Sequence, residues 1–298
     1  MANPIGGTGM ALLNNDTDVS VLVDGLDHVE GVAWGLDGYC YAGGEAGQIY
    51  SIDIEHKEAT QIADTGGFIL GLALDAQHNI YACDTGNRAV MKITPDGNVS
   101  KYSTGAPDEP FYTPNYPAFD TQGNLYVCDS GDWKADNGKI FVVRPSGETK
   151  VWTRTLCEFP NGLCVGPDGT SLFVAMSLNP PRVAEIAIAP DGSAGDARTV
   201  VELAGKVPDG VAFDTDGNLY IACYRPDRIY RHSADGNLEI LADDIEGTII
   251  AAPTNIAFCG ANRDILLSAN LGRWHITRYE TDATGLPLHY PDLDAHSH

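Results

Sequence analysis

Two carboxylates and two amides occupy equivalent places in a repeated sequence pattern. The six repeated segments are Glu30-Gly-Val-Ala-Trp, Leu70-Gly-Leu-Ala-Leu, Asn115-Tyr-Pro-Ala-Phe, Asn161-Gly-Leu-Cys-Val, Asp209-Gly-Val-Ala-Phe and Thr254-Asn-Ile-Ala-Phe. Oxygen ligands of this kind suit hard divalent cations such as Ca²⁺, which takes about 6–8 oxygens. Buried carboxylates need a cation, hydrogen-bond donors or water. The pattern therefore favours an open divalent-metal site. The alternative is a water-filled channel in which the amides donate to the carboxylates.

The elements that must position these residues are short strands. The segments recur every 40–48 residues, and most are followed by a turn, a second strand with an aromatic residue, and a third strand. Asp-Gly or Ser-Gly pairs then lead to a fourth strand, at Asp96-Gly97, Ser146-Gly147, Asp191-Gly192 and Asp235-Gly236. Asp-Gly between alternating apolar runs indicates a hairpin. Four antiparallel strands at this period predict an all-β, six-bladed β-propeller.

The last repeat supplies only three strands, at 254–258, 265–269 and 275–280. We expect the fourth to be Val19-Ser-Val-Leu-Val23, which would close the ring. The whole chain, residues 1–298, then forms one domain, with about 15 N-terminal and about 10 C-terminal residues peripheral. In a propeller the first strand of every blade lines the central channel, so the first residues of all six segments converge there.

Composition excludes several classes of partner. With 18 Lys and Arg against 41 Asp and Glu, the net charge is −23, which argues against binding to nucleic acid or to anionic membrane surfaces. No apolar run is long enough to span a membrane, and we find no secretory signal, so we expect a cytoplasmic protein. Four of the seven cysteines, Cys40, Cys83, Cys128 and Cys223, lie in or at the end of apolar runs, which predicts buried, reduced thiols.

Three of these motifs carry a family resemblance. Glu30-Gly, Pro160-Asn161-Gly162 and Pro208-Asp209-Gly210 resemble the metal-binding motifs of the senescence marker protein (regucalcin) and gluconolactonase family. The segments at 253–258 and 270–273 also resemble its bacterial members. The likeness covers residues 20 to 280 and implies a six-bladed propeller that hydrolyses lactones with one divalent cation. Calcium is the first expectation, with zinc, magnesium or manganese as alternatives.

The resemblance also implies roles for single residues. Glu30, Asn161 and Asp209 match the metal ligands, and Asp209 matches the proposed general base as well. Asn115 matches a position that contacts substrate or a water on the metal. Sugar-lactonase members carry an arginine two residues before that asparagine, whereas this chain has Thr113. The departure predicts a lactone or ester less polar than a sugar lactone.

Loops on the metal side of the channel are expected to shape the substrate pocket. These are residues 104–114, 129–138, 176–182, 223–228 and 270–274, and they carry Phe111, Tyr112, Trp133, Met176, Tyr224 and Arg225. The predicted substrate-binding residues are Asn115, the adjacent loop residue Thr113, and Tyr112, Trp133 and Arg225 from these loops. His28, two residues before Glu30, is interpreted as an ordinary loop residue.

The leading hypothesis is a divalent-metal-dependent lactonase with Asp209 and Asn115 as catalytic residues. A cation would polarise the carbonyl as a Lewis acid, and Asp209 would orient or deprotonate the attacking water. One alternative keeps the site but takes an aryl ester or phosphotriester. Another is a non-enzymatic calcium-binding propeller or interaction scaffold. A strictosidine-synthase-like condensing propeller uses a glutamate without metal, and the pair Asn161 and Asp209 argues against it. The sequence leaves the oligomeric state open.

Overall fold

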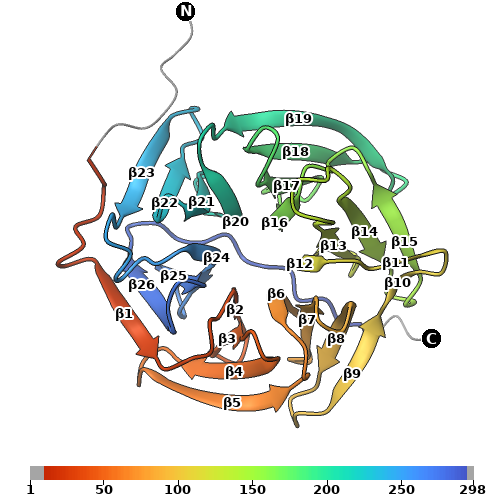
Figure 1. The fold of residues 1–298 in the computed structure, drawn as a ribbon, viewed down its shortest axis with the longest axis horizontal. Coiled ribbons are helices and arrows are strands. Elements are labelled where there is room, and N and C mark those ends of the chain that lie inside the picture. Colours follow the sequence, from red (N-terminus) through yellow and green to blue (C-terminus); the bar gives the residue numbers. More distant parts are fainter. Residues whose placement is uncertain (1–9, 294–298) are drawn as a thin grey trace, which may run out of the picture.

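The computed structural model describes residues 10–293, which form a ring of six four-stranded antiparallel sheets around a central channel (Figure 1). No helix occurs in this range, so none of it could cross a membrane as a helical span. The predicted all-β, six-bladed propeller is confirmed. Each sheet is one blade, and its strands follow one another outward from the channel.

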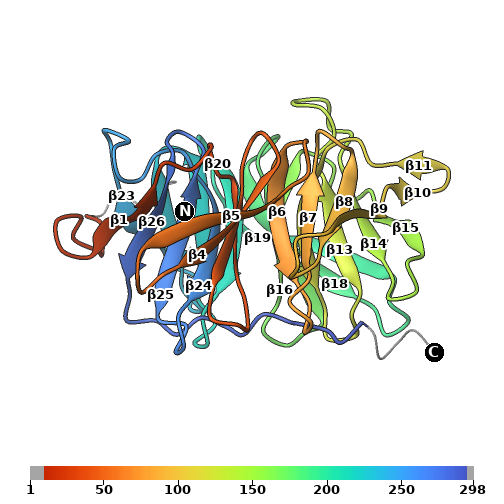
Figure 2. The same cartoon turned by 90° about the horizontal axis from the view of Figure 1, so that it is seen from below.

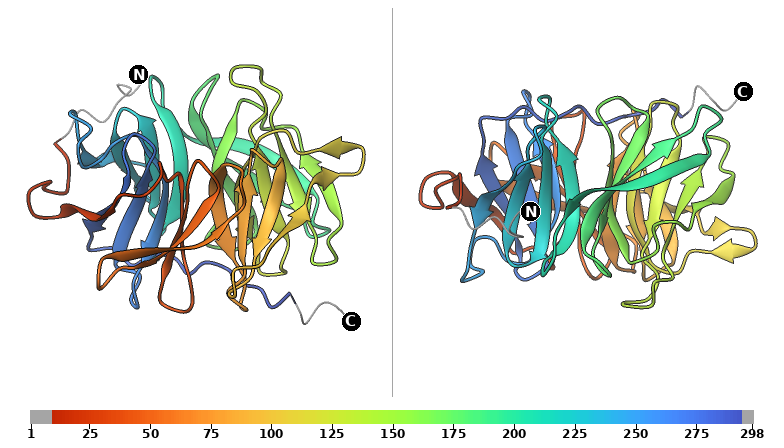
Figure 3. Two further views of the ribbon diagram at one scale, coloured as in Figure 1. Left: turned by 60° about the horizontal axis from the view of Figure 1, so that its bottom comes forward. Right: turned by 90° about the horizontal axis from the view of Figure 1, so that it is seen from above.

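The first three blades follow one another along the chain. From the channel outward they contain, in blade 1, β2 (Gly31–Trp34), β3 (Cys40–Gly43), β4 (Gln48–Asp53) and β5 (Glu58–Asp64); in blade 2, β6 (Ile69–Leu74), β7 (Ile80–Asp84), β8 (Ala89–Ile93) and β9 (Val99–Ser103); and in blade 3, β12 (Pro114–Phe119), β13 (Leu125–Asp129), β14 (Lys139–Val143) and β15 (Thr149–Thr153). A small hairpin, β10 (Gly105–Ala106) and β11 (Glu109–Pro110), projects from the rim beside β15 (Figure 3).

The other three blades complete the ring. From the channel outward they contain, in blade 4, β16 (Pro160–Val165), β17 (Ser171–Met176), β18 (Arg182–Ile188) and β19 (Ala194–Glu202); in blade 5, β20 (Val207–Phe213), β21 (Leu219–Arg225), β22 (Arg228–His232) and β23 (Leu238–Asp243); and in blade 6, β24 (Pro253–Cys259), β25 (Ile265–Asn270), β26 (His275–Glu280) and β1 (Val19–Asp24). The N-terminal strand β1 thus closes the ring by pairing with β26, with Val19 opposite Tyr279.

Apolar side chains fill the spaces between neighbouring blades. Between blades 2 and 3, for example, the Tyr81 ring meets Phe119 edge-on, with centroids 5.1 Å apart. The four cysteines predicted to be buried are buried, and all seven cysteines are free thiols. Removal of this apolar surface from water is what holds the blades together, because adjacent blades share few backbone hydrogen bonds.

Three of the acidic residues, Asp75, Asp120 and Asp214, occupy one repeated turn. In blade 2 the Asp75 carboxylate accepts hydrogen bonds from the Asn79 backbone N–H at 2.9 Å, the Asn79 side chain at 2.8 Å and the Tyr81 hydroxyl at 2.9 Å. Asp214 binds Asn218 and Tyr220 in the same way in blade 5. These carboxylates stabilise the turn between the first two strands of the blade. Part of the large negative charge is therefore structural.

The C-terminal segment, residues 284–293, crosses the face of the ring at which the inner strands end (Figure 2). We call it the strap. The Leu286 N–H donates to the Phe213 carbonyl at 2.8 Å, and the Tyr290 hydroxyl donates to the Trp34 carbonyl at 2.7 Å. We expected about ten C-terminal residues to be peripheral. Residues 289–293 are instead packed on the ring, because Tyr290 and Leu293 bury apolar surface against it. The final five residues of that prediction lie outside the described range.

Candidate metal centre

The first residues of four of the repeated segments, which lie near the starts of the inner strands, bring oxygen-bearing side chains to one end of the channel. Glu30, Asn115, Asn161 and Asp209 are each more than nine-tenths buried. Close approach of the strands is possible because glycine follows three of them. A Cβ atom at Gly162 would lie 2.4 Å from the Asp209 carbonyl oxygen, and one at Gly31 would lie 2.0 Å from the Leu70 carbonyl oxygen. The glycines in these motifs thus serve packing between blades, which draws the polar residues together.

Two serines fix the orientation of the two predicted amides. The Asn115 Nδ2 donates to Ser130 Oγ at 2.9 Å, and Ser130 Oγ donates to the Pro160 carbonyl at 2.8 Å. A carbonyl only accepts, so the hydroxyl proton goes to Pro160 and the hydroxyl oxygen must accept from Asn115. The amide therefore turns its nitrogen to the serine and keeps its oxygen free.

The same arrangement recurs one blade further on. Asn161 Nδ2 donates to Ser177 Oγ at 3.3 Å, and Ser177 Oγ donates to the Pro208 carbonyl at 2.7 Å. The sequence analysis missed both serines. The signal was present, since Ser130 and Ser177 stand 15 and 16 residues after the amide of their own blade.

Blade 6 contributes a residue other than the predicted one. Thr254 turns aside, and its Oγ1 donates to the Glu30 carbonyl at 2.7 Å. Its neighbour Asn255 is fully buried, and Asn255 Nδ2 lies 3.4 Å from Asp209 Oδ1. Asn255 stands at the position that glycine occupies in blades 1, 2, 4 and 5, so blade 6 carries its polar side chain one residue later in the segment. Blade 2 presents Leu70, an apolar side chain, at this level.

Three amide oxygens at this end are buried without a hydrogen-bond partner among the described residues: Asn115 Oδ1, Asn161 Oδ1 and Asn255 Oδ1. A buried acceptor left unpaired costs about 1–3 kcal/mol. Together with the two carboxylates, they form an all-oxygen donor set, which is the chemistry of a calcium or magnesium site. The residues present therefore fit a divalent cation. They fit the water-filled channel less well, because Asn115 and Asn161 each donate an amide N–H to a serine and leave the side-chain oxygen unpaired. Asn255 is the amide that does donate to a carboxylate, from Nδ2 to Asp209 Oδ1 at 3.4 Å.

The charged forms of the two carboxylates are destabilised in the absence of a cation. Burial raises the pKa of Glu30 well above its usual value, and the charges of Asp209 and Glu45 raise it further. Burial also raises the pKa of Asp209 to about 7, and a hydrogen bond from Asn161 offsets part of that rise. A divalent cation would supply the positive charge that both groups lack, which is a second reason to place it here.

A second group of possible ligands lies at the mouth of the channel. Asp27, His28 and Glu45 offer ligand atoms within 4.8 Å of one another, and all three are partly or fully exposed. The Asp27 carboxylate already accepts hydrogen bonds from the Ala46 N–H at 3.2 Å and the Gln48 side chain at 3.0 Å. The deeper set has unpaired oxygens and this one has competing partners, so the deeper set is the better candidate for a cation site.

The predicted substrate-binding residues lie on the loops of this face. Tyr112 and Thr113 donate their backbone N–H groups to the Asp129 carboxylate, at 2.6 and 3.0 Å. Asp129 thereby fixes the loop that leads to Asn115. Trp133 is 53% exposed and meets Phe159 edge-on at 4.8 Å. This places two aromatic side chains, Tyr112 and Trp133, on the solvent side of the loops next to blade 3.

Three other loop residues have contacts or burial that differ from what the sequence predicted. Arg225 stacks on the ring of its neighbour Tyr224, 4.8 Å from the centroid, and forms an ion pair with Asp227 at 3.0 Å. Its charge is therefore partly engaged already. Phe111 and Met176 were expected to line the pocket but are fully buried in the packing between blades.

Comparison with known proteins identifies related sequences. A family model for the SMP-30/Gluconolactonase/LRE-like region matches residues 45–269. A gluconolactonase from Zymomonas mobilis is 28% identical over 188 residues, which cover 56% of this chain and 51% of that protein. The protein STRICTOSIDINE SYNTHASE-LIKE 3 from Arabidopsis thaliana is 28% identical over 187 residues, covering 57% and 46%. The chain thus spans about half the length of these curated relatives.

Solved structures share the fold over nearly the whole chain. A gluconolactonase from Xanthomonas campestris superposes with a TM-score of 0.75 at 20% identity, covering 90% of this chain and 89% of that one. A calcium-binding protein, regucalcin, from Agrobacterium tumefaciens gives 0.74 at 17% identity, covering 91% and 95%. At these identities the likeness concerns the fold alone.

Proposed function

Because the chain belongs to the SMP-30/gluconolactonase/LRE-like family, we propose that it is a lactonase that opens the ester ring with the help of one divalent cation. The observation that carries the proposal is the set of three unpaired amide oxygens buried beside two carboxylates. A calcium buffer would need the same oxygens. The set lies at the same end of the channel as the loops that carry the exposed side chains of Tyr112 and Trp133, which favours a role with substrate.

Glu30, Asn161 and Asp209 would hold the cation, with Asn115 and Asn255 close enough to the set to contribute an oxygen. The chemistry such a cation supplies is Lewis-acid polarisation of a carbonyl and lowering of the pKa of water. Calcium is our first assignment because every donor is oxygen. Zinc, magnesium and manganese are the alternatives to calcium.

Three side chains of the protein would perform the other roles in the reaction. Asp209 would orient the attacking water and take its proton, acting through its position. The amide of Asn115, held by Ser130, would orient the substrate carbonyl or the water. Glu30 would serve mainly as a ligand that keeps the site neutral. The reaction consumes water and releases a hydroxy acid, with the proton passing through Asp209 to solvent.

Thr113 supports a substrate that is less polar than a sugar lactone. It stands where sugar-lactonase members of the family carry an arginine, and its backbone N–H is bound to Asp129. The exposed aromatic rings of Tyr112 and Trp133 offer apolar contact on the same side, whereas Arg225 is tied to Asp227. We therefore place alkyl- or aryl-substituted lactones ahead of polyhydroxylated ones.

A lactone panel tests the proposal. The metal-free protein is prepared with a chelator, its metal content is measured by elemental analysis, and proton release is followed after addition of Ca²⁺, Zn²⁺, Mg²⁺ or Mn²⁺. We expect hydrolysis of at least one alkyl or aryl lactone that disappears on chelation and returns with metal. Aryl esters and a phosphotriester run in parallel. Turnover of those alone would give the same site a different substrate class, and full activity without metal would exclude the cation.

A further inference from the structure

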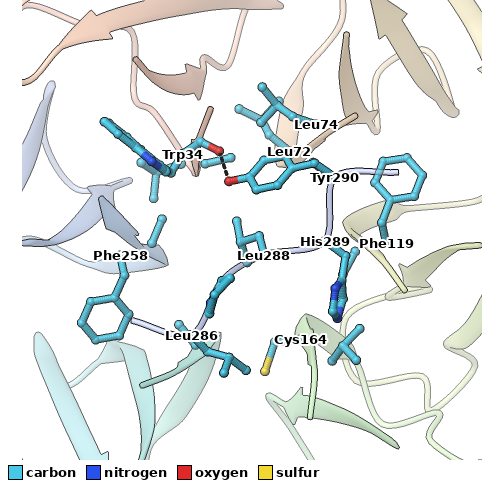
Figure 4. A pocket seen from close by; sticks show the side chains of 18 of the residues that line it. Trp34, Leu72, Leu74, Phe119, Cys164, Phe258, Leu286, Leu288, His289 and Tyr290 are labelled. Carbon is cyan, nitrogen blue, oxygen red and sulfur yellow. Dashed lines mark hydrogen bonds between the residues drawn. The ribbon is translucent and has the colours of Figure 1, made fainter. Parts of the chain in front are cut away.

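A second cavity occupies the other end of the channel. Its volume is about 390 Å³, and none of the metal-centre residues lines it. Most of the wall consists of the third, fourth and fifth residues of the six repeated segments, and the strap supplies another side through residues 286–290. Figure 4 shows the strap passing across this space, with Tyr290 beside Leu72 and Leu74.

The cavity exists because one position in the repeat is always small. The fourth residue of each segment lines it, and these residues are Ala33, Ala73, Ala118, Cys164, Ala212 and Ala257. The flanking positions carry large apolar side chains, which pack between the blades and leave the middle of the ring open. A larger side chain at the fourth position would fill the space. The strap covers the cavity without filling it.

The lining selects for a neutral, apolar ligand. Trp34, Phe119, Phe213 and Phe258 contribute aromatic surface. Burial lowers the pKa of His289, which favours the neutral imidazole, with one donor and one acceptor nitrogen. The Tyr290 hydroxyl is already bound to the Trp34 carbonyl. The lining includes one charged residue, Arg263, whose Nε donates to the Gly285 carbonyl at 2.9 Å. Most of the lining is apolar, so water is held poorly, and the net charge of −23 opposes the binding of an anion beside that single cation.

The cavity also has an opening through which a ligand could enter. Leu288 on the strap and Leu36 after β2 both line it, yet they are 49% and 58% exposed. Large apolar side chains that are half exposed at an opening form an apolar rim, which suits entry of a ligand of the same character.

We propose that this cavity is a second binding site, for a neutral small molecule that is largely apolar and carries a single hydrogen-bonding group. The site is independent of the metal centre, which lies at the opposite end of the same strands. It is a binding site and contains no catalytic group.

The test uses the neutral fluorescent probe N-phenyl-1-naphthylamine and the full chain. We expect a saturable rise in its emission with one site per chain, unchanged by chelator and by Glu30→Gln. Ala118→Leu, which fills the cavity, should weaken binding at least about tenfold, since burial of a ligand of this size depends on the free volume. The matched control is Ala59→Leu on the exposed outer strand β5, which should bind like the parent.

A second measurement locates the probe without any variant. Cys164 lines the cavity and Cys157 does not, and both thiols are partly buried. Labelling with methyl methanethiosulfonate, read by mass spectrometry, should slow at Cys164 and remain unchanged at Cys157 when the probe is bound. The proposal is overturned if the folded protein gives no saturable signal, or if the probe leaves Cys164 labelling unchanged. Either result is independent of whether the protein hydrolyses lactones.

Discussion

The channel has two ends built from the same six strands. At the end where the strands begin, carboxylates and amides face one another, and three amide oxygens have no partner. At the end where they finish, alanines and aromatic rings surround an apolar cavity under the strap. The backbone repeats almost unchanged from blade to blade, so the difference arises only from which residue occupies each register position. A propeller can therefore carry two unrelated sites on one set of strands.

The sharpest test of this division is Asp209→Asn. Asparagine keeps one carbonyl oxygen for the cation but is not basic, so we expect kcat for lactone hydrolysis to fall at least about 100-fold at saturating metal. Glu30→Gln should chiefly weaken metal affinity, and part of its activity should return as metal is raised. The measurement is kcat across a metal titration with bound metal counted directly.

Leu288→Ala at the other end of the channel is the control and should hydrolyse lactone at the parent rate. If Asp209→Asn binds metal normally and keeps near-parental kcat, Asp209 is not the base.

A smaller effect is expected from the serines that hold the amides. Ser177→Ala frees Asn161 to rotate, which should weaken cation binding about tenfold, the usual scale for groups that orient metal ligands. Isothermal titration of the metal-free protein with Ca²⁺ measures the affinity. Ser103→Ala is the control, because Ser103 is also buried but is hydrogen-bonded to Thr149 on an outer strand. Equal affinities in both variants would remove the serine from the site.

The pH dependence of the stability of the metal-free protein distinguishes the two ends of the channel, and the measurement requires no substrate. The folded protein raises the pKa of Asp209 from 3.8 to about 7, and that of Glu30 also rises, mainly by burial. Both groups bind protons more tightly when folded. Their stabilising contribution is therefore complete below pH 4 and is lost as pH rises toward 7.

In chelator we expect the free energy of unfolding to fall by on the order of 1 kcal/mol or more between pH 5 and pH 8. Asp209→Asn should flatten that slope, whereas Leu288→Ala should preserve it. Denaturant titrations at each pH measure the effect. A slope that is the same in all three proteins would show that the carboxylates are solvated and not buried together.

The smallest change is expected at the cysteines of the blades. Cys40, Cys83, Cys128 and Cys223 are fully buried, and burial raises the pKa of Cys83, Cys128 and Cys223. Since the thiolate is the reactive form, these thiols should label only after denaturation. Thiol titration before and after unfolding tests this. Rapid labelling of all four in the native protein would contradict the observed burial.

Sequence reasoning predicted the propeller because every blade repeats the same turn and strand pattern, and it placed Glu30, Asn115, Asn161 and Asp209 at one end of the channel. It failed at Asn255, because Asn255 stands where four other segments have glycine, and the pattern was interpreted only at the first residue of each segment. The strap was missed for a different reason. Its apolar residues Leu286, Leu288 and Tyr290 alternate over only five residues and belong to none of the repeats, so nothing in the sequence connects them with the inner strands of the six blades.

Closure of the ring has a consequence during synthesis. Strand β1 is made first, yet its partner β26 lies about 260 residues later, from Val19 to Tyr279. At about 5–20 residues per second, the ribosome leaves β1 unpaired for some 15–50 s. Joining the two ends then costs about 5 kcal/mol of chain entropy. An apolar strand that waits this long is an aggregation hazard, and Asp16, Asp18 and Asp24 flank it as charged gatekeepers.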